Sequence, residues 1–192
     1  VLKSSYKNFK IILIDNESQN SFPDEINKSE KIQIIKNENN EGFSRANNQG
    51  IKYSIKNGFD YVLLLNNDTL IKNDLIDSLI QQSSNLNQKI IQPLILNYDG
   101  TKIWNAGGKI NNFFGSFKIL KKGKSFKNFK SNRNLTEWFT GCCVLIKTDI
   151  FMDIGYFDER FFAYYEDIDY SIRLKKMGYS IALMTDSYLQ HY

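Results

Sequence analysis

Short apolar runs alternate with stretches of helical periodicity in the first half of the chain, and this alternation limits the fold more than any other feature. Four runs have the length of a strand, and they span 9–15, 31–36, 60–66 and 89–96. Helical stretches fall between them, at 42–58 and 73–84. Continuous apolar strands joined by helices are typical of parallel sheets covered on both faces. We therefore predict an α/β fold with a mostly parallel sheet flanked by helices.

The second half of the chain has a less regular pattern. Residues 97–110 predict a hairpin that turns at Asp99-Gly100. The segment 111–132 interleaves Phe with Lys and has little periodicity, so we interpret it as a mobile loop or insertion. A strand leading into a short helix is expected in 138–151, and a helix followed by a last strand is expected in 164–185.

Composition and charge narrow the class of protein. One domain over 1–192 is expected because no repeat and no linker interrupts the chain, with a first half at 1–96 and a second at 97–192. The net charge of +4, from 25 Lys and Arg against 21 Asp and Glu, is too small to point to nucleic acid. No apolar stretch approaches the roughly 20 residues of a membrane span. Cys142 and Cys143 are neighbours, which rarely bridge, so we expect no disulfide and a cytoplasmic location.

Three polar residues, Asn66, Asn67 and Asp68, follow the apolar run YVLLL directly. A turn is the simplest interpretation, since Asn and Asp favour turns. Ligands of an open α/β sheet, however, bind beyond the carboxyl ends of its strands, where Asp15 is also expected. Carboxylate and amide oxygens suit Mg²⁺ or Mn²⁺, which use few protein ligands together with phosphate oxygens. A metal site at this strand end is therefore the second interpretation.

A second cluster of acids, Glu166, Asp167 and Asp169, follows the aromatic run FFAYY. Acids in the first turn of a helix interact well with its dipole, and Asp169 could pair with Arg173. Three carboxylates within four residues are nevertheless more than a helix cap needs, and mutual repulsion can give one of them a pKa suited to a base. The only histidine, His191, is either structural or a metal ligand.

Five features in this order resemble the family-2 glycosyltransferases with the GT-A fold, especially their rhamnosyltransferase-like branch. They are IILIDNES, NNEGFSRANNQG, DYVLLLNNDT, FTGCCVLIKTDIFMDIGYFDERFFAYYEDIDYSIRLKKMGY and His191. The resemblance covers most of the chain apart from about 97–134. It implies a GT-A fold whose first strand and helix would precede Val1, and we expect a chain without them to bind its donor poorly.

The resemblance also implies roles for individual residues. Asp167 would be the catalytic base, with Glu166 beside it. Asp68 would hold Mg²⁺ or Mn²⁺, His191 would complete the metal or diphosphate contact, and Trp138 would lie near the acceptor or donor sugar. The nucleotide-sugar contacts would come from Asp15, Arg45, Asn48, Asn66, Asn67, Asp68 and Gly141. The metal site is expected to be weak, because Asn66 replaces an acid that is common in the family.

Such a protein would be an inverting, metal-dependent glycosyltransferase. It would move a sugar from a UDP-, dTDP- or GDP-linked donor to a hydroxyl of a saccharide or lipid-linked acceptor, in polysaccharide, O-antigen or glycolipid assembly. A nucleotidyltransferase is a rival interpretation, although such enzymes usually have a Gly-rich basic loop after the first strand, which this sequence lacks. A non-catalytic module that binds sugar nucleotides is the other alternative.

The Phe and Lys residues of 111–132 suggest a membrane contact as well. Basic and aromatic residues together can lie on anionic lipid surfaces, and the alternative is a solvated loop whose phenylalanines cover the acceptor side. The residues concerned are Phe113, Phe114, Phe117, Phe126, Phe129, Lys118, Lys121, Lys122, Lys124, Lys127 and Lys130. A peripheral place on the inner face of the cell membrane is therefore one expectation, and no nucleic-acid partner is expected.

Overall fold

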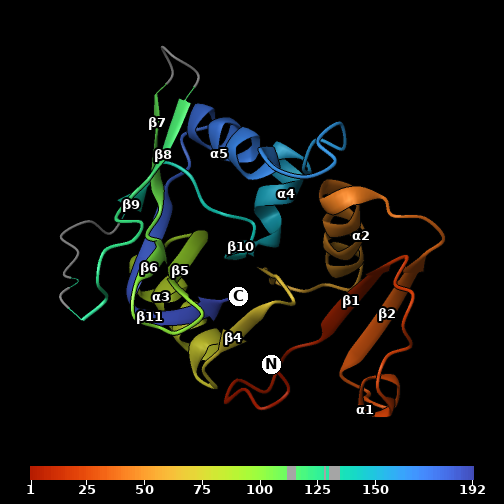
Figure 1. Cartoon of the computed structure of the whole chain (residues 1–192). Coiled ribbons are helices and arrows are strands. Elements are labelled where there is room, and N and C mark those ends of the chain that lie inside the picture. The colour runs from red at the N-terminus through yellow and green to blue at the C-terminus, as the bar shows by residue number, and fades with distance from the viewer. Residues whose placement is uncertain (112–115, 128, 130–134) are drawn as a thin grey trace.

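Strands and helices follow one another in the computed structural model, which describes residues 1–111, 116–127, 129 and 135–192 (Figure 1). The first half contains β1 (Ile11–Asn16), α1 (Asp24–Asn27), β2 (Ile32–Asn37), α2 (Gly42–Lys56), β3 (Tyr61–Leu65), β4 (Thr69–Ile71), α3 (Leu75–Leu86) and β5 (Ile90–Asn97). The second contains β6 (Ile103–Asn105), β7 (Gly108–Asn111), β8 (Ser116–Ile119), β9 (Leu135–Thr136), β10 (Cys143–Lys147), α4 (Thr148–Ile154), α5 (Glu166–Lys176) and β11 (Ile181–His191).

The central sheet has the strand order β3-β10-β5-β11-β4. Strands β5 and β11 pair in parallel, while β10 runs antiparallel to both β3 and β5. Strands β3, β5 and β11 therefore share one direction, and β1 and β2 form a separate parallel pair. The predicted α/β class with a mostly parallel, helix-flanked sheet is confirmed. The sequence pattern did not reveal that β10 enters between β3 and β5.

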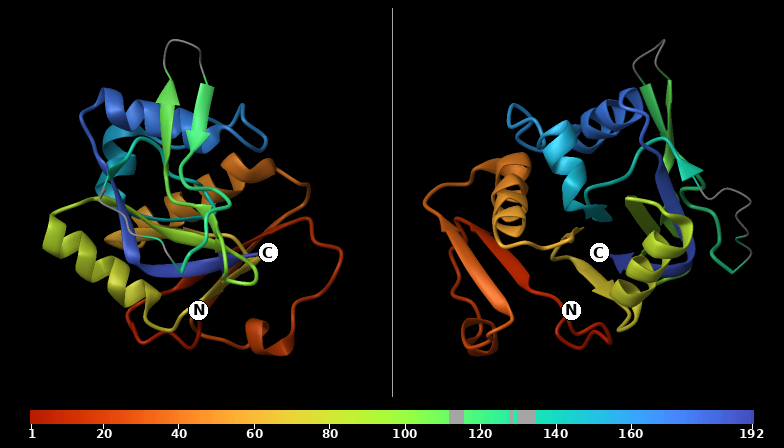
Figure 2. Two further views of the ribbon diagram at one scale, coloured as in Figure 1. Left: turned by 60° about the vertical axis from the view of Figure 1, so that its left-hand side comes forward. Right: turned by 180° about the vertical axis from the view of Figure 1, so that it is seen from behind.

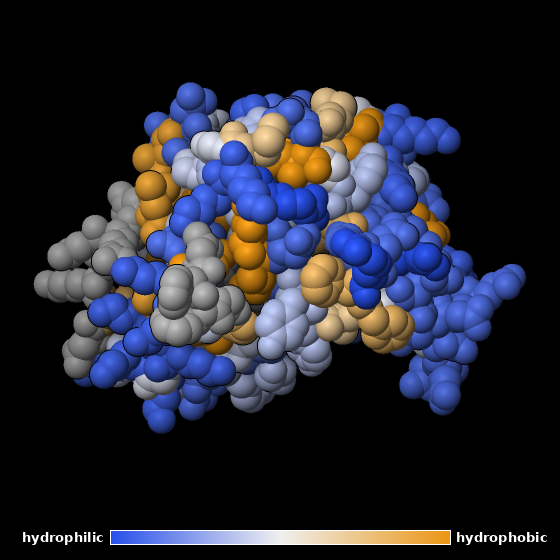
Figure 3. All heavy atoms as spheres, turned by 90° about the horizontal axis from the view of Figure 1, so that it is seen from above, coloured by the Kyte–Doolittle hydropathy of each residue, from blue (hydrophilic) through white to orange (hydrophobic). Residues whose placement is uncertain are grey.

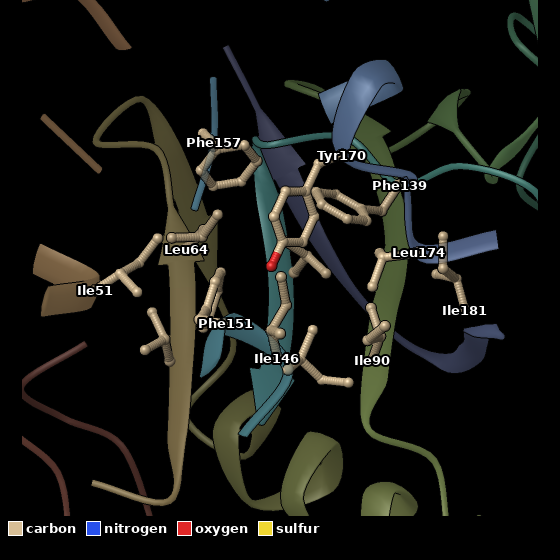
Figure 4. Close-up of a cluster of buried hydrophobic side chains, with 13 residues drawn as sticks. Ile51, Leu64, Ile90, Phe139, Ile146, Phe151, Phe157, Tyr170, Leu174 and Ile181 are labelled. Carbon is tan, nitrogen blue, oxygen red and sulfur yellow. The ribbon is translucent and has the colours of Figure 1, made fainter. Parts of the chain in front are cut away.

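Strand β10 can occupy this central place because its side chains are apolar on both faces. Val144 and Ile146 point into a core cluster built with α2, α4 and α5, whereas Cys143 and Leu145 point into a second cluster under α3. The first cluster surrounds the ring of Tyr170, as Figure 4 shows. Figure 2 shows the helices on the two sides of the sheet.

The hairpin predicted at 97–110 is confirmed, since β5 and β6 pair antiparallel and Gly100 has the positive φ of 71° that its turn requires. The interpretation of 111–132 as a loop is wrong in part, because β8 pairs with β7. Figure 1 shows that these two strands stand out from the body of the molecule. Phe113, Phe114 and Lys130 lie outside the described residues.

Strand β11 changes its register against β5 between Met184 and Tyr188, and its last residues pair with β4, the strand at the edge of the sheet. There His191 pairs with Thr69 of β4, a three-residue strand that follows the Asn66–Asp68 turn. This edge strand was missed in the sequence because it is short. Among the described residues, no helix is long and apolar enough to cross a membrane.

Candidate active site

The backbone of residues 139–142, just before β10, lies at the centre of the predicted site. Ser171 Oγ of α5 accepts a hydrogen bond from Phe139 N at 3.3 Å, and Gln92 Oε1 of β5 accepts one from Thr140 N at 2.8 Å. On the next residue, Gly141 N donates to Asp167 Oδ2 at 3.2 Å. The carbonyl of Cys142 then accepts a hydrogen bond from Asn66 N at 2.9 Å. Side chains of α5 and β5 and the turn after β3 are thus tied to one short segment.

Gln92 is a supporting residue that the sequence analysis did not identify. Its side chain is fully buried, and its Nε2 donates to Asn105 Oδ1 at 2.9 Å. Buried amides are costly unless they are hydrogen-bonded, so this pair fixes the position of Thr140. The sequence feature that could have identified it is a single Gln within the otherwise apolar run IIQPLIL.

Gly141 packs closely against a neighbour on α2. A Cβ atom at this position would come within 2.8 Å of Phe43 Cζ, so a larger residue would displace the Phe43 ring. The missing side chain lets the backbone approach both Phe43 and the acids at the start of α5. The predicted contact of Gly141 with the nucleotide sugar stays a prediction.

Asp167 and Glu166 begin helix α5 and have different surroundings. Asp167 accepts hydrogen bonds from the backbone N–H groups of Gly141 and Ile168, at 3.2 and 2.8 Å. Burial raises the pKa of Asp167, although these hydrogen bonds act in the opposite direction. Glu166 is only 5% exposed, and its Oε2 has no hydrogen-bond partner. Burial raises the pKa of Glu166 to about 7, and the neighbouring charge of Asp167 adds to the effect.

Asp68 and His191 are brought together by the pairing of β4 with β11. His191 Nε2 lies 3.5 Å from Asp68 Oδ1, and the N–H of Tyr192 donates to the Asp68 carbonyl at 3.0 Å. The ring of Trp104 packs against the imidazole with centroids 4.5 Å apart. The Asp68 carboxylate remains half exposed, with 49% of its side chain accessible. It is therefore open to a ligand, while His191 is held in place.

Asp68 also lies close to the 139–142 segment. Burial, together with the negative charge of Asp68, raises the pKa of the Cys142 thiol to about 12. Because Cys142 follows Gly141 directly, Asp167 and the turn that carries Asp68 are hydrogen-bonded to the same dipeptide. The roles predicted for these residues, a metal-binding acid and a base, stay predictions.

The Asp68–His191 pair fits a divalent cation as a partial set of ligands. It offers a carboxylate oxygen and an imidazole nitrogen, and Mg²⁺ and Mn²⁺ commonly complete such sets with water and phosphate oxygens. Within the described ranges, no group of three or more His, Cys, Asp or Glu residues could hold a metal. A cation here would therefore depend on a ligand such as a diphosphate. The Asn66–Asp68 turn, in which Thr69 Oγ1 donates to the Asn66 carbonyl, carries Asn67 on its exposed side.

Asp15 lies at the end of β1, as the sequence predicted, and its exposed fraction is 8%. Hydrogen bonds from Ser18 lower the pKa of Asp15 and keep it ionised. Arg45, also predicted to contact the nucleotide, is paired instead with Glu41 and Glu159. This pairing places its charge between two carboxylates rather than in front of a free phosphate site.

The predicted nucleotide contact of Asn48 is replaced by a structural one. Asn48 is 1% exposed, and its Nδ2 donates to the Phe157 carbonyl at 2.9 Å and to Glu159 Oε1 at 3.0 Å. Its Oδ1 accepts a hydrogen bond from Phe157 N at 3.0 Å. Both N–H donors are thus used to hold residues 157–159 against α2. Buried inner positions of a helix could not be told from ligand-facing ones in the sequence.

Trp138 was predicted to lie near a sugar, yet its side chain is buried, with only 3% exposed. Its indole Nε1 has no hydrogen-bond partner and lies against Gly108, where a Cβ atom would come within 1.7 Å. The indole packs edge-on with Phe117, at a centroid distance of 5.5 Å. The Trp138 indole is therefore not itself exposed, although it contacts the ring of Phe117, which is.

Comparison with known proteins identifies the family of the chain. The model of the family described as "Glycosyl transferase family 2" matches residues 1–155. Low-salt glycan biosynthesis hexosyltransferase Agl10 of Haloferax volcanii is 29% identical over 173 residues, covering 90% of this chain and 55% of that protein. The dTDP-rhamnosyl transferase RfbF of Shigella flexneri is 24% identical over 185 residues, covering 96% of this chain and 60% of that protein. The chain thus spans little more than half the length of these relatives.

Among solved structures, GalNAc-T7 crystallised with UDP, GalNAc and Mn²⁺ has a similar fold. Its TM-score is 0.68 at 17% identity, over 95% of this chain and 37% of that protein. At this identity the likeness concerns the fold alone, and it confirms the GT-A-type architecture expected from the sequence.

The raised pKa of Glu166 predicts a pH-dependent stability. The folded chain binds a proton here more tightly than the unfolded chain, whose value is near 4.5, so this contribution to the free energy of unfolding falls as pH rises from about 4.5 to about 7. We expect the stability of the wild type relative to Glu166→Gln to decrease across that range in urea unfolding. Glu159→Gln, where the pKa is lowered, should show no such decrease. If the free energies of unfolding of the wild type and Glu166→Gln changed in parallel with pH, the raised pKa of Glu166 would be contradicted.

Proposed function

This chain belongs to glycosyl transferase family 2, and from that membership we propose that it carries the catalytic domain of an inverting glycosyltransferase. The observation that supports the proposal most strongly is the Gly141-Cys142 dipeptide. Asp167 is hydrogen-bonded to one side of it, and the turn that carries Asp68 is hydrogen-bonded to the other. A base and a diphosphate-binding acid in one site are what a single displacement at a sugar carbon requires.

In the proposed reaction the acceptor hydroxyl attacks the anomeric carbon of the donor sugar and loses its proton to Asp167. The nucleoside diphosphate leaves from the opposite face, so the anomeric centre is inverted. Asp167 is suited to this task because burial raises its pKa while backbone N–H groups fix its orientation. Glu166 beside it holds a proton near neutral pH and so adds less negative charge to the pocket.

Asp68 and His191 are the residues that would hold Mg²⁺ or Mn²⁺. When bound, such a cation neutralises charge on the diphosphate leaving group. Asp15, at the end of β1, would accept hydrogen bonds from the ribose or base. A UDP-, dTDP- or GDP-linked sugar is the proposed donor, in keeping with the dTDP-rhamnosyl transferase RfbF and the UDP complex of GalNAc-T7. The acceptor would be a saccharide or a lipid-linked saccharide of an envelope polymer.

The two halves of the chain would contribute differently to this reaction. Residues 1–96 supply Asp15 and Asp68, on the side of the nucleotide sugar, and residues 97–192 supply Asp167 and the acceptor side. The halves nevertheless share one sheet, because β10 of the second half lies between β3 and β5 of the first.

Replacing the proposed base tests this function directly. In the full-length enzyme, we expect Asp167→Asn to lower transfer by about 10²- to 10⁴-fold, because the acceptor proton loses its base. Donor binding should change little, since Asp167 faces the acceptor. Asp169→Asn is the matched control. Asp169 lies two residues after Asp167 on the same helix, and its carboxylate is paired with Arg173.

The measurement is release of nucleoside diphosphate together with calorimetric binding of UDP- and dTDP-sugars in Mn²⁺. Wild-type-like transfer by Asp167→Asn would rule out the assigned base. Release of pyrophosphate by the wild type would instead indicate a nucleotidyltransferase, and binding without turnover would indicate a non-catalytic module.

We also propose a peripheral contact with the cytoplasmic face of a membrane, by electrostatic attraction. Four lysines of the segment after β8 are exposed, namely Lys121, Lys122, Lys124 and Lys127. Phe126 and Phe129 would not face the lipid, because both pack against the core cluster that includes residues of β5 and β6. The contact would therefore rest on charge, which salt screens.

Vesicle binding tests this contact. Changing Lys121, Lys122 and Lys124 to Gln should weaken binding to anionic vesicles about 100-fold at low salt, since each lysine near the surface contributes about 1 kcal/mol. Changing Lys28, Lys56 and Lys176 to Gln, on other elements, serves as the control. Negligible binding of the wild type to anionic and neutral vesicles alike in co-sedimentation would remove the proposal.

A further inference from the structure

Three aromatic rings form a continuous row from the core to the surface beside Asp167. Trp138 is buried, and its indole meets the ring of Phe117 edge-on at 5.5 Å between centroids. Phe117, on β8, in turn meets Tyr165 edge-on at 5.7 Å. The exposed fraction rises along the row, from 3% at Trp138 to 40% at Phe117 and 58% at Tyr165. The outer two rings therefore present apolar surface to solvent next to the start of α5.

The backbone before α5 is held in an unfavourable conformation that exposes these rings. Tyr164 and Tyr165 both have positive φ angles, of 69° and 71°. Each such residue costs on the order of 1–3 kcal/mol, and strain of this kind gathers at functional sites. Tyr164 is 80% exposed, so the strain does not serve to bury its ring. Tyr165 directly precedes Glu166 and Asp167, which fixes the row relative to the acids.

The loop that carries these tyrosines is anchored on α2. Phe43 N donates to the Phe162 carbonyl at 2.6 Å, and Gly42, with a φ of 78°, leaves no room for a Cβ atom next to that carbonyl. The loop is therefore held to α2 at Phe162, and the Tyr165 ring contacts Phe117 of β8. Seen from above, the face where Figure 1 places α5 and β7–β8 is largely hydrophilic, with hydrophobic residues gathered in patches (Figure 3).

Exposed rings beside a base suit one kind of ligand particularly well. A pyranose has a face of C–H groups that packs on aromatic rings and a rim of hydroxyls that needs polar partners. Phe117 and Tyr165 offer ring surface and the Tyr165 hydroxyl offers a polar group, while Asp167 follows two residues after Tyr165 at the start of α5. The donor diphosphate belongs on the other side of the Gly141-Cys142 dipeptide, at Asp68 and His191.

We propose that Phe117 and Tyr165, whose rings meet at 83° and are supported from below by buried Trp138, form a shelf beside Asp167, on which a sugar ring of the acceptor stacks on the face of one ring and abuts the other. The inference rests on the proposed function and deepens it, because it makes the terminal acceptor unit a saccharide. Tyr165 and Phe117 are then residues that bind and orient the acceptor. Trp138 is a positioning residue, which acts through Phe117.

Saturation-transfer NMR on the full chain tests the shelf without knowledge of the natural acceptor. The probes are the methyl glycosides of glucose, N-acetylglucosamine, mannose and rhamnose, with glycerol as a hydroxyl-rich probe that lacks a ring. All are measured with UDP or dTDP and with Mg²⁺, which unlike Mn²⁺ does not broaden NMR signals. We expect transfer to the ring C–H protons of at least one glycoside and none to glycerol. Tyr165→Ala and Phe117→Ala should each weaken its binding roughly 2- to 10-fold, the range for one aromatic contact.

Two control variants leave the ring surface of Phe117 and residue 165 in place. Tyr165→Phe should retain most of the binding, and Tyr53→Ala, which removes a ring from α2, should bind like the wild type. Absence of transfer to every glycoside, or equal transfer in Tyr165→Ala and the wild type, would overturn the shelf. Binding of the nucleotide is measured in the same samples. Its failure would count against the proposed function, whereas nucleotide binding without glycoside binding would count against the shelf alone.

Discussion

The hydrogen bonds of residues 139–142 are the constraint on which the rest of the site depends. Gln92, Asp167 and the turn at Asn66 each bind a different backbone group of this segment. An unpaired buried N–H or C=O group costs free energy, so each of these partners is held as firmly as the segment itself. Strand β10 continues from this segment into the middle of the sheet, which holds the segment in place. The groups bonded to the segment come from distant parts of the sequence, and they are positioned with it.

The site separates its carboxyl groups by environment. Asp167 and Glu166 are withdrawn from water at the start of α5, and burial raises the pKa of both. Asp68 stays half exposed at the sheet edge beside His191. Groups of the same chemical type can thus take different tasks, one accepting a proton and the other binding a cation with a diphosphate. The aromatic row beside Asp167 extends the same division, since it lies on the acceptor side.

The periodicity of the sequence was enough to predict the α/β class and the β5–β6 hairpin, because strands and turns leave local patterns. The roles of Asp68 and Asp167 came from the family resemblance and stay predictions. The periodicity did not predict the place of β10, since pairing between distant strands leaves no local pattern. The sequence also did not reveal that Asn48 and Trp138 point inward, because motif position does not fix side-chain direction. Gln92 and Tyr165 were missed for a related reason, as one acts through a backbone contact and the other through its neighbours.

The central claim is that the Asp68–His191 pair and Asp167 belong to one site around the Gly141-Cys142 dipeptide. Paramagnetic broadening of backbone amide signals by Mn²⁺, in the presence of a nucleoside diphosphate, measures this most directly. We predict strong broadening of the Gly141 and Ile168 amides, little at Gly58 beyond the far end of α2, and loss of the effect in Asp68→Asn. Broadening that spares Gly141 and Ile168, or that persists unchanged in Asp68→Asn, would contradict the claim.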